Sequence, residues 1–325
     1  MIDSQPNSFL QRLAIGRPLL LDGATGTELQ RRGVNTGLPL WSARALIEAP
    51  SVLQAVHTDY INAGTDIITT NTFRTQRRTL ERAGIGSRAR ELTQLAVQIA
   101  RDAARSVDRK IFVAGSMSPL EDCYAPELVP PDGALWIEHA EIARDLAQAG
   151  CDVLLVETMN TVREAVIAAR CAKATGLPVC VSFVVGPNGQ PPDKVNLARV
   201  EFGDRHAPLE PAQGLLLLSG ESLDDAVTAL RSINPAVILI NCVPLAVIDR
   251  AFAELRAAHS GPIGLYANVG HADDQVGWTL TDDVLPGAYG RHAQQWMQQG
   301  AAIIGGCCGT TPDHIAVLKE LMRDT

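Results

Sequence analysis

The sequence predicts a single (β/α)8 barrel that spans residues 1–325. Eight short runs rich in Val, Ile and Leu recur along the chain, and longer stretches with helical periodicity lie between them. Near-continuous apolar runs are typical of parallel strands that are buried on both faces. Because strand and helix alternate eight times, a closed TIM barrel is favoured over a doubly wound open sheet, which is the alternative fold.

The expected elements follow one another in a regular order. The eight strands are Pro18–Asp22, Asp66–Thr70, Ile111–Gly115, Asp152–Glu157, Pro178–Phe183, Ala236–Asn241, Pro262–Ala267 and Ala301–Gly305. The expected helices are Pro50–Ala63, Arg88–Val107, Trp136–Ala149, Thr161–Thr175, Ser222–Ile233, Ala246–Ala258, Ala288–Gln299 and Pro312–Met322. Gly64, Gly150 and Gly300 stand where a helix C-cap is expected before the next strand.

Two long segments interrupt this rhythm. Glu121–Gly133 follows the third predicted strand, and the polar, Pro-rich stretch Gly186–Gln213 follows the fifth. Both begin at the carboxyl ends of strands, the face on which barrel enzymes carry their active sites. Long loops in that position are more often lids or pocket walls than linkers, although nothing in Gly186–Gln213 indicates a particular role.

The composition excludes several classes of partner. The formal net charge is -8 and the pI is near 5.4, so the chain lacks the basic surface that nucleic acid requires. No segment reaches the roughly 18 uninterrupted apolar residues that a membrane span needs, and the N-terminus does not read as a signal peptide. We therefore expect a cytoplasmic protein that acts on small molecules, without nucleic-acid or membrane partners. An oligomer is compatible with the sequence.

The cysteines carry the strongest local signal. Their number, seven, is odd and argues against a disulfide framework. Cys307 and Cys308 follow the eighth strand within Gly305–Gly309. Neighbouring strand side chains point to opposite faces, so both thiols can serve one metal only if the chain turns sharply, which the flanking glycines permit. Cys242 stands at the end of the sixth strand. That strand end is two strand spacings, or roughly 10 Å around the barrel wall, from the end of the eighth strand. We expect all three thiols to meet at one mouth.

Such a cluster indicates a particular chemistry. Three thiolates and one open position describe a catalytic site for Zn²⁺, and soft ligands favour zinc over magnesium or calcium. The expected substrate is a thiol that must become a nucleophile, because the metal lowers the pKa of an incoming thiol. Cys151, Cys171 and Cys180 fit small buried side chains instead, and Cys123 is not expected to be a ligand.

The sequence resembles the homocysteine S-methyltransferase family, which includes the betaine and S-methylmethionine enzymes and the N-terminal module of cobalamin-dependent methionine synthase. The resemblance runs nearly end to end, and its two cysteine elements are the specific part. The matching segments, in the order of the family, are Leu21–Leu29, Leu40–Ala43, Thr70–Phe73, Ala114–Ser116, Glu157–Thr158, Asn241–Cys242 and Gly305–Thr311.

This resemblance implies methyl transfer to the thiol of homocysteine, giving methionine, with zinc held by Cys242, Cys307 and Cys308. The positions that it matches to substrate binding are Asp22, Gly23, Glu157, Asn241 and Asn268. Among them, Glu157 is implied to hold the homocysteine ammonium. An α-amino acid needs a carboxylate for its ammonium and backbone N–H groups for its carboxylate. The structural alternatives are a helix or turn cap for Asp22 and an ordinary ion pair for Glu157.

The methyl donor should be activated by positive charge, as a sulfonium or quaternary ammonium is. Aromatic rings favour such cations, and Trp41, Phe73 and Tyr124 lie in loops at the predicted mouth. Simple loop packing is the alternative role for each ring. Thr158 stands where the betaine enzymes of the family carry a tyrosine, which disfavours betaine. S-methylmethionine or S-adenosylmethionine is therefore the favoured donor.

Other functions remain open. Methyl transfer to another thiol or to a selenol would use the same site. A non-catalytic zinc- or thiol-binding protein would need the cysteines but neither Asp22 nor Glu157. A hydrolytic zinc barrel is disfavoured, because such enzymes bind metal through His and carboxylates and no His-x-His pair occurs in this chain.

Overall fold

Eight parallel strands form the central sheet of the computed structural model, which describes residues 8–191, 214–273, 277–279 and 284–323. The strands are β1 Leu19–Leu20, β2 Ile67–Thr69, β3 Phe112–Met117, β4 Val153–Met159, β5 Val179–Phe183, β8 Val237–Asn241, β9 Ile263–Ala267 and β12 Ile303–Gly306. Their spatial order is β1-β12-β9-β8-β5-β4-β3-β2, and a parallel bridge between Leu21 and Ile67 joins the last strand to the first. The sheet is therefore a closed barrel, and the predicted fold is confirmed.

Each predicted strand is present, with shifted ends. β3 and β4 run two residues further than predicted, through Met117 and Met159. The prediction ended each strand near the end of its apolar run, but both strands continue through polar residues here, of which Thr158 has a left-handed φ of +59°. These carboxyl-end residues include Ser116, Glu157 and Thr158, all of which line the cavity described below.

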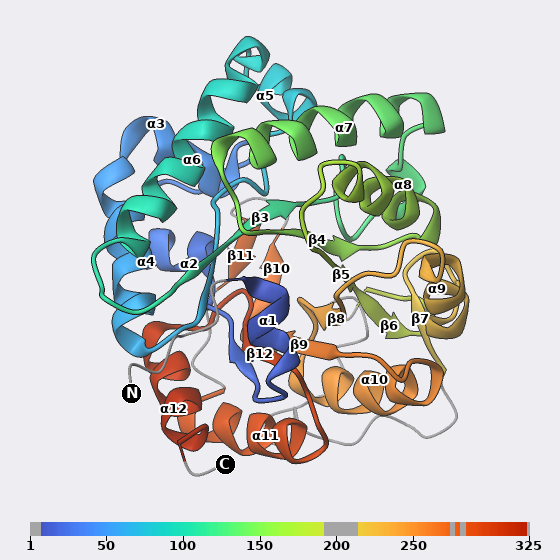
Figure 1. Ribbon diagram of the computed structural model, residues 1–325. Helices are drawn as coiled ribbons and strands as arrows, with labels where there is room; N and C mark the ends of the chain where they lie inside the picture. Colours follow the sequence, from blue (N-terminus) through green and yellow to red (C-terminus); the bar gives the residue numbers. More distant parts are fainter. Residues whose placement is uncertain (1–7, 192–213, 274–276, 280–283, 324–325) are drawn as a thin grey trace.

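Helices surround the barrel (Figure 1). The long ones are α4 Pro50–Ala63, α6 Ala89–Ala104, α7 Asp132–Ala149, α8 Val162–Lys173, α9 Leu223–Leu230, α10 Leu245–Ala258, α11 Pro286–Gln298 and α12 Pro312–Leu321. The left-handed caps expected at Gly64 and Gly150 are present. Because α7 begins at Asp132, four residues before the predicted start, Asp132 and Gly133 belong to its first turn rather than to the loop. Within the described residues, no helix is long and apolar enough to cross a membrane.

Several short elements were not predicted, because they are too short to show a hydrophobic period. They are α1 Phe9–Ala14, α2 Thr25–Arg31, α3 Ala45–Glu48, α5 Arg77–Arg82, the 3-10 helices Trp41–Arg44, Gly86–Arg88 and Pro126–Leu128, and two hairpins. The first hairpin pairs β6 Val185–Pro187 with β7 Leu215–Leu217, so the predicted loop Gly186–Gln213 begins inside a strand. Residues 192–213 of that loop lie outside the described residues. The second hairpin pairs β10 His271–Asp273 with β11 Gly277–Thr279.

The barrel interior is closed at the amino ends of the strands. A cluster of buried side chains drawn from all eight strands includes Phe9 of α1, whose ring meets that of Phe112 edge to face at 5.8 Å. In Figure 1, α1 lies across the middle of the barrel. Burial of an aromatic side chain of this size stabilises the fold by about 2 kcal/mol. The opposite, carboxyl end is therefore the one that can open onto a site.

Candidate metal centre and active site

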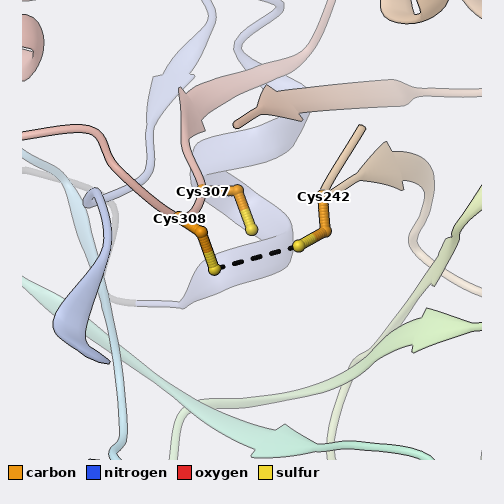
Figure 2. Close-up of side chains that lie close together, drawn as sticks. All are labelled: Cys242, Cys307 and Cys308. Carbon is orange, nitrogen blue, oxygen red and sulfur yellow. Dashed lines mark hydrogen bonds between the residues drawn. The ribbon is translucent and has the colours of Figure 1, made fainter. Parts of the chain in front are cut away.

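Three cysteine side chains converge at the carboxyl ends of β8 and β12. Cys242 directly follows β8, Cys307 and Cys308 directly follow β12, and β9 runs between these strands. The Sγ atoms of Cys242 and Cys308 lie 3.9 Å apart, and all three Sγ atoms lie within 4.8 Å of one another (Figure 2). The structure thus brings together the three thiols that the strand spacing predicted to meet.

The spacing of these sulfur atoms fits a metal ion. Metal–sulfur bonds of about 2.3 Å at tetrahedral angles place two sulfurs about 3.8 Å apart, close to the 3.9 Å between Cys242 and Cys308. A donor set made of thiolates suits soft or borderline metals. No other group of three His, Cys, Asp or Glu side chains comes together in this way in the part of the chain that the structure describes.

The three thiols differ in pKa. Hydrogen bonds with Cys242 and Cys308 lower the pKa of Cys307 to about 5. The hydrogen bond with Cys307 in turn raises the pKa of Cys242, and the contacts with Cys242 and Cys307 raise the pKa of Cys308. Because like charges this close oppose one another, the three thiols need a compensating cation before all can ionise. The cluster therefore favours binding of a cation.

Backbone hydrogen bonds hold the turn that carries Cys307 and Cys308. The Cys307 N–H donates to Ala267 O at 2.7 Å, and Cys308 O accepts from Val269 N at 2.7 Å, so the turn is tied to the segment after β9. Gly309 has a φ of +81°, and a Cβ atom there would lie only 1.7 Å from Val269 O. Only glycine fits this position, which explains part of the glycine pattern around the cysteine pair.

Backbone strain is concentrated at the same mouth. Five described residues other than glycine have a positive φ, and three of them line one cavity: Trp41, Thr158 and Cys242, with φ of +48°, +59° and +55°. For such side chains the left-handed region costs of order 1–3 kcal/mol each, and it persists only where the surroundings impose it. No sequence pattern indicated this, because Asn and Gly are the residues normally associated with that conformation.

Two buried carboxylates face the same cavity. Asp22 follows β1, and its oxygens accept from the N–H of Thr69 at 2.7 Å and from the Thr69 hydroxyl at 2.9 Å. Glu157 lies in β4 and accepts from the hydroxyls of Ser116 and, at 3.1 Å, Tyr266. Both carboxylates are thus held in place by neutral donors, and neither has a cationic partner among the described residues.

The electrostatics of this pair suit a cationic ligand. Burial raises the pKa of Asp22 to about 8, and the nearby Glu157 contributes further to that shift. Burial likewise raises the pKa of Glu157 to about 7. Two ionised carboxylates out of water and close together are costly. A bound ammonium group would favour their ionised forms. The two carboxylates predicted to lie near the substrate therefore form a site that a cation would stabilise.

The two asparagines predicted near the substrate do not line the cavity. Asn241 is buried, and its Oδ1 accepts from Thr158 N at 3.1 Å and from the Ser182 hydroxyl at 2.6 Å, while its Nδ2 donates to the Thr158 hydroxyl at 2.8 Å. Asn241 therefore holds the strained Thr158 next to Glu157. Asn268 is also buried, and its side-chain amide has no hydrogen-bond partner among the described residues. A direct substrate contact of either asparagine stays a prediction.

The cavity has a volume of about 580 Å³, within the range of small-molecule sites. Its lining includes Asp22, Gly23, Glu157, the three cysteines and the three aromatic residues predicted as donor walls, Trp41, Phe73 and Tyr124. Gly26 leaves room for the Trp41 ring, because a Cβ atom at residue 26 would lie 2.6 Å from the indole Nε1. The structure thus places the aromatic, acidic and thiol groups in one space.

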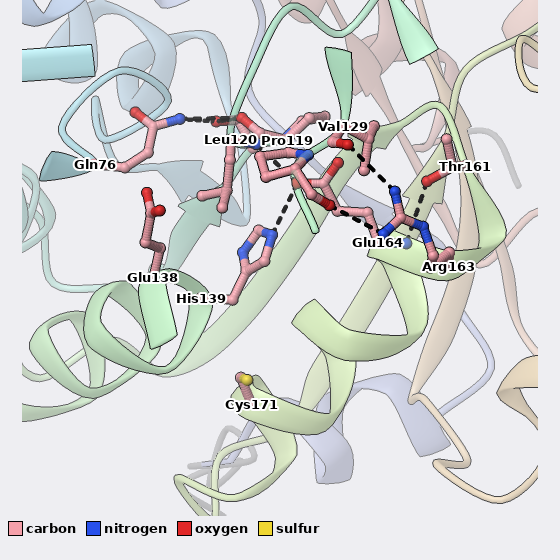
Figure 3. A network of polar contacts seen from close by, with 12 residues as sticks. Gln76, Pro119, Leu120, Val129, Glu138, His139, Thr161, Arg163, Glu164 and Cys171 are labelled. Carbon is pink, nitrogen blue, oxygen red and sulfur yellow. Dashed lines mark hydrogen bonds and ion pairs between the residues drawn. The ribbon is translucent and has the colours of Figure 1, made fainter. Parts of the chain in front are cut away.

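The loop after β3 forms one wall of this cavity, and a network of buried polar contacts fixes it (Figure 3). Glu164 of α8 accepts from the N–H of Leu120 at 2.8 Å, and the same oxygen lies 3.0 Å from Nε2 of His139. Gln76 donates to Pro119 O at 3.1 Å. The predicted role of this loop as a pocket wall agrees with its position.

Tyr124 in this loop reaches the cysteine cluster itself. Its hydroxyl lies 3.2 Å from Sγ of Cys242 and 3.1 Å from the carbonyl oxygen of the same residue. A phenol that donates to a thiolate stabilises its negative charge. Tyr124 was predicted only as a wall for the donor, and the contact with Cys242 gives its hydroxyl a second role.

If the three thiols hold a metal, we expect Tyr124→Phe to weaken its binding about 10-fold, with Zn²⁺ as the probe, because partners that hydrogen-bond a metal ligand typically contribute 10- to 100-fold to affinity. Competition with a chromophoric chelator on fully reduced protein measures the change. Phenylalanine keeps the ring, so circular dichroism and thermal unfolding should stay those of the wild type. An unchanged affinity would show that the hydroxyl does not support the Cys242 thiolate.

Some residues of this site were not predicted. Ser116 and Tyr266 hold Glu157, Thr69 holds Asp22, and Arg74 adds a positive charge to the cavity lining. Ser116 does lie in a segment matched by the family resemblance and Tyr266 in a predicted strand, at the carboxyl ends of β3 and β9. That position was the available signal, since the ends of barrel strands are where functional side chains gather.

A barrel whose carboxyl-end mouth holds three thiols in metal-binding geometry beside two buried carboxylates defines a metal-binding barrel enzyme. The model of the family described as homocysteine S-methyltransferase matches residues 19–322. The chain therefore belongs to the homocysteine S-methyltransferase family and is a methyltransferase, as the resemblance of its sequence implied.

Individual relatives agree with this assignment. The chain is 31% identical to the homocysteine S-methyltransferase YbgG of Bacillus subtilis, over 94% of each chain. It is 26% identical to the selenocysteine methyltransferase of Astragalus bisulcatus, over 94% of this chain and 93% of that one. Its structure is similar to that of the homocysteine methyltransferase MmuM from Escherichia coli in the metallated form, with a TM-score of 0.77, 27% identity, and coverage of 96% and 99% of the two chains.

Proposed function

We propose that this chain transfers a methyl group from a small cationic donor to the thiol of L-homocysteine and gives methionine, with zinc as its metal. The observation that carries the proposal is the placement of three thiols and two buried carboxylates around one cavity. Together they match the two ends of an amino acid that bears a thiol. A zinc- or thiol-storage protein would need only the cysteines.

The proposed role of Cys242, Cys307 and Cys308 is to hold the zinc ion, since their sulfur spacing fits tetrahedral bonds. Zinc held by these residues would supply the positive charge that lowers the pKa of a substrate thiol beside it. Tyr124 and Asn241 support the ligands: the former contacts Cys242, and the latter lies 3.9 Å from Sγ of Cys307.

Asp22 and Glu157 are the proposed partners of the acceptor's ammonium. Thr69, Ser116 and Tyr266 orient their oxygens before the substrate arrives, which reduces the reorganisation that binding requires. Gly23, whose backbone lines the cavity beside Asp22, is the proposed contact for the acceptor's carboxylate. With both ends held, the thiol of the acceptor is directed toward the cysteine cluster.

Trp41, Phe73 and Tyr124 are the proposed walls for the cationic donor, because the faces of aromatic rings attract sulfonium and ammonium groups. Methyl transfer needs the acceptor sulfur, the methyl carbon and the leaving sulfur in line. As the new carbon–sulfur bond forms, the old one breaks, and a sulfonium donor leaves as a neutral thioether. We favour S-methylmethionine or S-adenosylmethionine as donor.

A donor screen tests this proposal. Reduced, zinc-loaded protein is supplied with homocysteine and, in separate reactions, S-methylmethionine, S-adenosylmethionine, betaine or methylfolate, and methionine is measured. We expect methionine from a sulfonium donor and none from betaine. A parallel reaction with selenocysteine tests the second acceptor suggested by the relative from Astragalus bisulcatus. Zinc-loaded protein that forms methionine from no donor would contradict the proposal.

A further inference from the structure

Arg74 is a cation in the cavity with no role in the chemistry described so far. It follows Phe73 in the loop after β2, is partly exposed and lines the cavity. Its guanidinium carbon lies 5.6 Å from the centre of the Phe73 ring. Its Nε atom is buried and has no hydrogen-bond partner among the described residues. A guanidinium nitrogen buried without a partner is unfavourable, so this arrangement calls for an anionic ligand.

The neighbouring arginines show that the lack of a partner is specific to this position. Arg77, Arg78 and Arg82, all in α5, form ion pairs with Glu141, Glu138 and Glu121. In the described structure Arg74 forms no ion pair, although Asp122 also lines the cavity. The segment thus satisfies its other cations and leaves Arg74 available.

The backbone at Arg74 is held firmly. Thr75, the next residue, is buried, and its hydroxyl lies 2.8 Å from that of Thr93. Gln76 is buried as well and donates to the Ser118 hydroxyl at 2.7 Å. Because both following side chains are fixed in the interior, the position of Arg74 at the cavity wall is set by the fold.

The charges of the cavity indicate what Arg74 binds. The other ionisable side chains of the lining are Asp22, Asp122, Glu157, Tyr124, Tyr266 and cysteines, so Arg74 is the only basic residue among the described lining residues. Beside Phe73, it stands at the wall assigned to a cationic donor. A positive charge there repels a donor that is only a cation, but it attracts one that also carries an anion.

We propose that Arg74 binds the carboxylate of the methyl donor and so selects sulfonium donors that are amino acids over sulfonium donors without a carboxylate. A guanidinium matches a carboxylate with two parallel N–H···O bonds. This inference rests on the proposed methyl transfer and specifies its donor class. It also separates the two substrates: acidic residues hold the acceptor's ammonium, and Arg74 holds the donor's carboxylate.

The test compares S-methylmethionine with its methyl ester, in which an added methyl group removes the carboxylate charge. Calorimetry measures binding of each to zinc-loaded wild type, Arg74→Gln and Arg74→Lys without homocysteine, so the readout does not require turnover. Arg88→Gln is the matched control, since Arg88 pairs with Glu91 at the surface and does not line the cavity.

We expect the wild type to bind the acid at least 10-fold more tightly than the ester. Arg74→Gln should weaken binding of the acid by about 10- to 100-fold, the effect of losing charge-assisted hydrogen bonds, and leave the ester within about threefold. Arg74→Lys should recover part of the loss, the homocysteine KM should stay unchanged, and Arg88→Gln should behave as the wild type.

Other outcomes would overturn the inference. Equal losses for acid and ester would show that Arg74 acts on the shape of the pocket. A raised homocysteine KM with unchanged donor binding would assign the guanidinium to the acceptor. A wild type that does not bind the acid would exclude this donor class. If the acid binds through Arg74 but no methionine forms, the proposed function fails, and with it the assignment of this ligand as the methyl donor, while carboxylate binding by Arg74 is supported.

Discussion

Cys307→Ser is expected to lose its metal and nearly all of its methionine-forming activity. A hydroxyl replaces the thiol whose pKa is lowest in the cluster, and two sulfur ligands remain in a site built for three. Loss of a residue that only supports a ligand typically costs 10- to 100-fold, so loss of a ligand should lower kcat/KM by more than about 100-fold. Elemental analysis of reduced protein and a methionine assay measure the two effects.

Cys171→Ser is the matched control for this variant. Cys171 is buried, whereas Cys307 is partly exposed, and it lies on α8 with its thiol 3.7 Å from Trp136 O and does not line the cavity. This variant should keep one zinc ion per chain and the wild-type rate. Treatment of the wild type with a chelator should abolish activity, and added zinc should restore it. Full zinc content and rate in Cys307→Ser would refute the three-thiol site.

The parts of this molecule that the sequence predicts well are those that depend on local pattern. Continuous apolar runs revealed all eight strands, because a strand buried on both faces has few polar positions. The cysteine pair was recognisable because glycines flank it. Glycines permit the sharp turn that two neighbouring thiols need if both are to serve one metal. The observed requirement for glycine is clear at Gly309, whose Cβ would collide with Val269 O.

What the sequence could not show depends on contacts between distant segments. The hydroxyl of Tyr124 meets Cys242 across 118 positions of the chain, and Tyr266 meets Glu157 across 109. Neither contact has a local signature, since loop conformation and barrel closure bring the partners together. The helix α1 was missed for another reason: its six residues are too few for a helical period, and it packs on the barrel interior through Phe9 and the partly buried Leu13.

Glu157→Gln is expected to raise the homocysteine KM by about 100-fold with a smaller effect on kcat. Glu157 is buried, and removing one charge of a buried ion pair costs about 2–5 kcal/mol. Glutamine keeps the size of the side chain and an oxygen that can accept from Ser116 or Tyr266, so the pocket should keep its shape. Steady-state kinetics with the donor held at saturation measures the change. Glu91→Gln, at an exposed surface pair with Arg88, is the control and should leave KM unchanged.

The pH dependence of ligand binding gives a second readout that isolates the carboxylate. Norleucine carries the ammonium and carboxylate of the substrate but no sulfur, so its binding does not involve ionisation of a thiol. The pKa of Glu157 is raised to about 7 in the free protein. Below that pH, ammonium binding must displace a proton, whereas above it the carboxylate is already charged. Norleucine affinity should therefore rise between pH 6 and 8 in the wild type, and more weakly in Glu157→Gln.

Asp22→Asn combined with Glu157→Gln shows whether the two carboxylates hold the same ammonium. If they do, the second substitution should reduce norleucine affinity by less than it does alone, because the first has already removed one of the ammonium's two partners. The two losses of affinity should then not add. In the single Glu157→Gln variant, Asp22 still ionises within this pH range, since burial raises its pKa to about 8. The double variant should lose the rise with pH altogether. Fully additive losses would show that Asp22 does not share the ammonium with Glu157 and serves instead as a structural partner of Thr69.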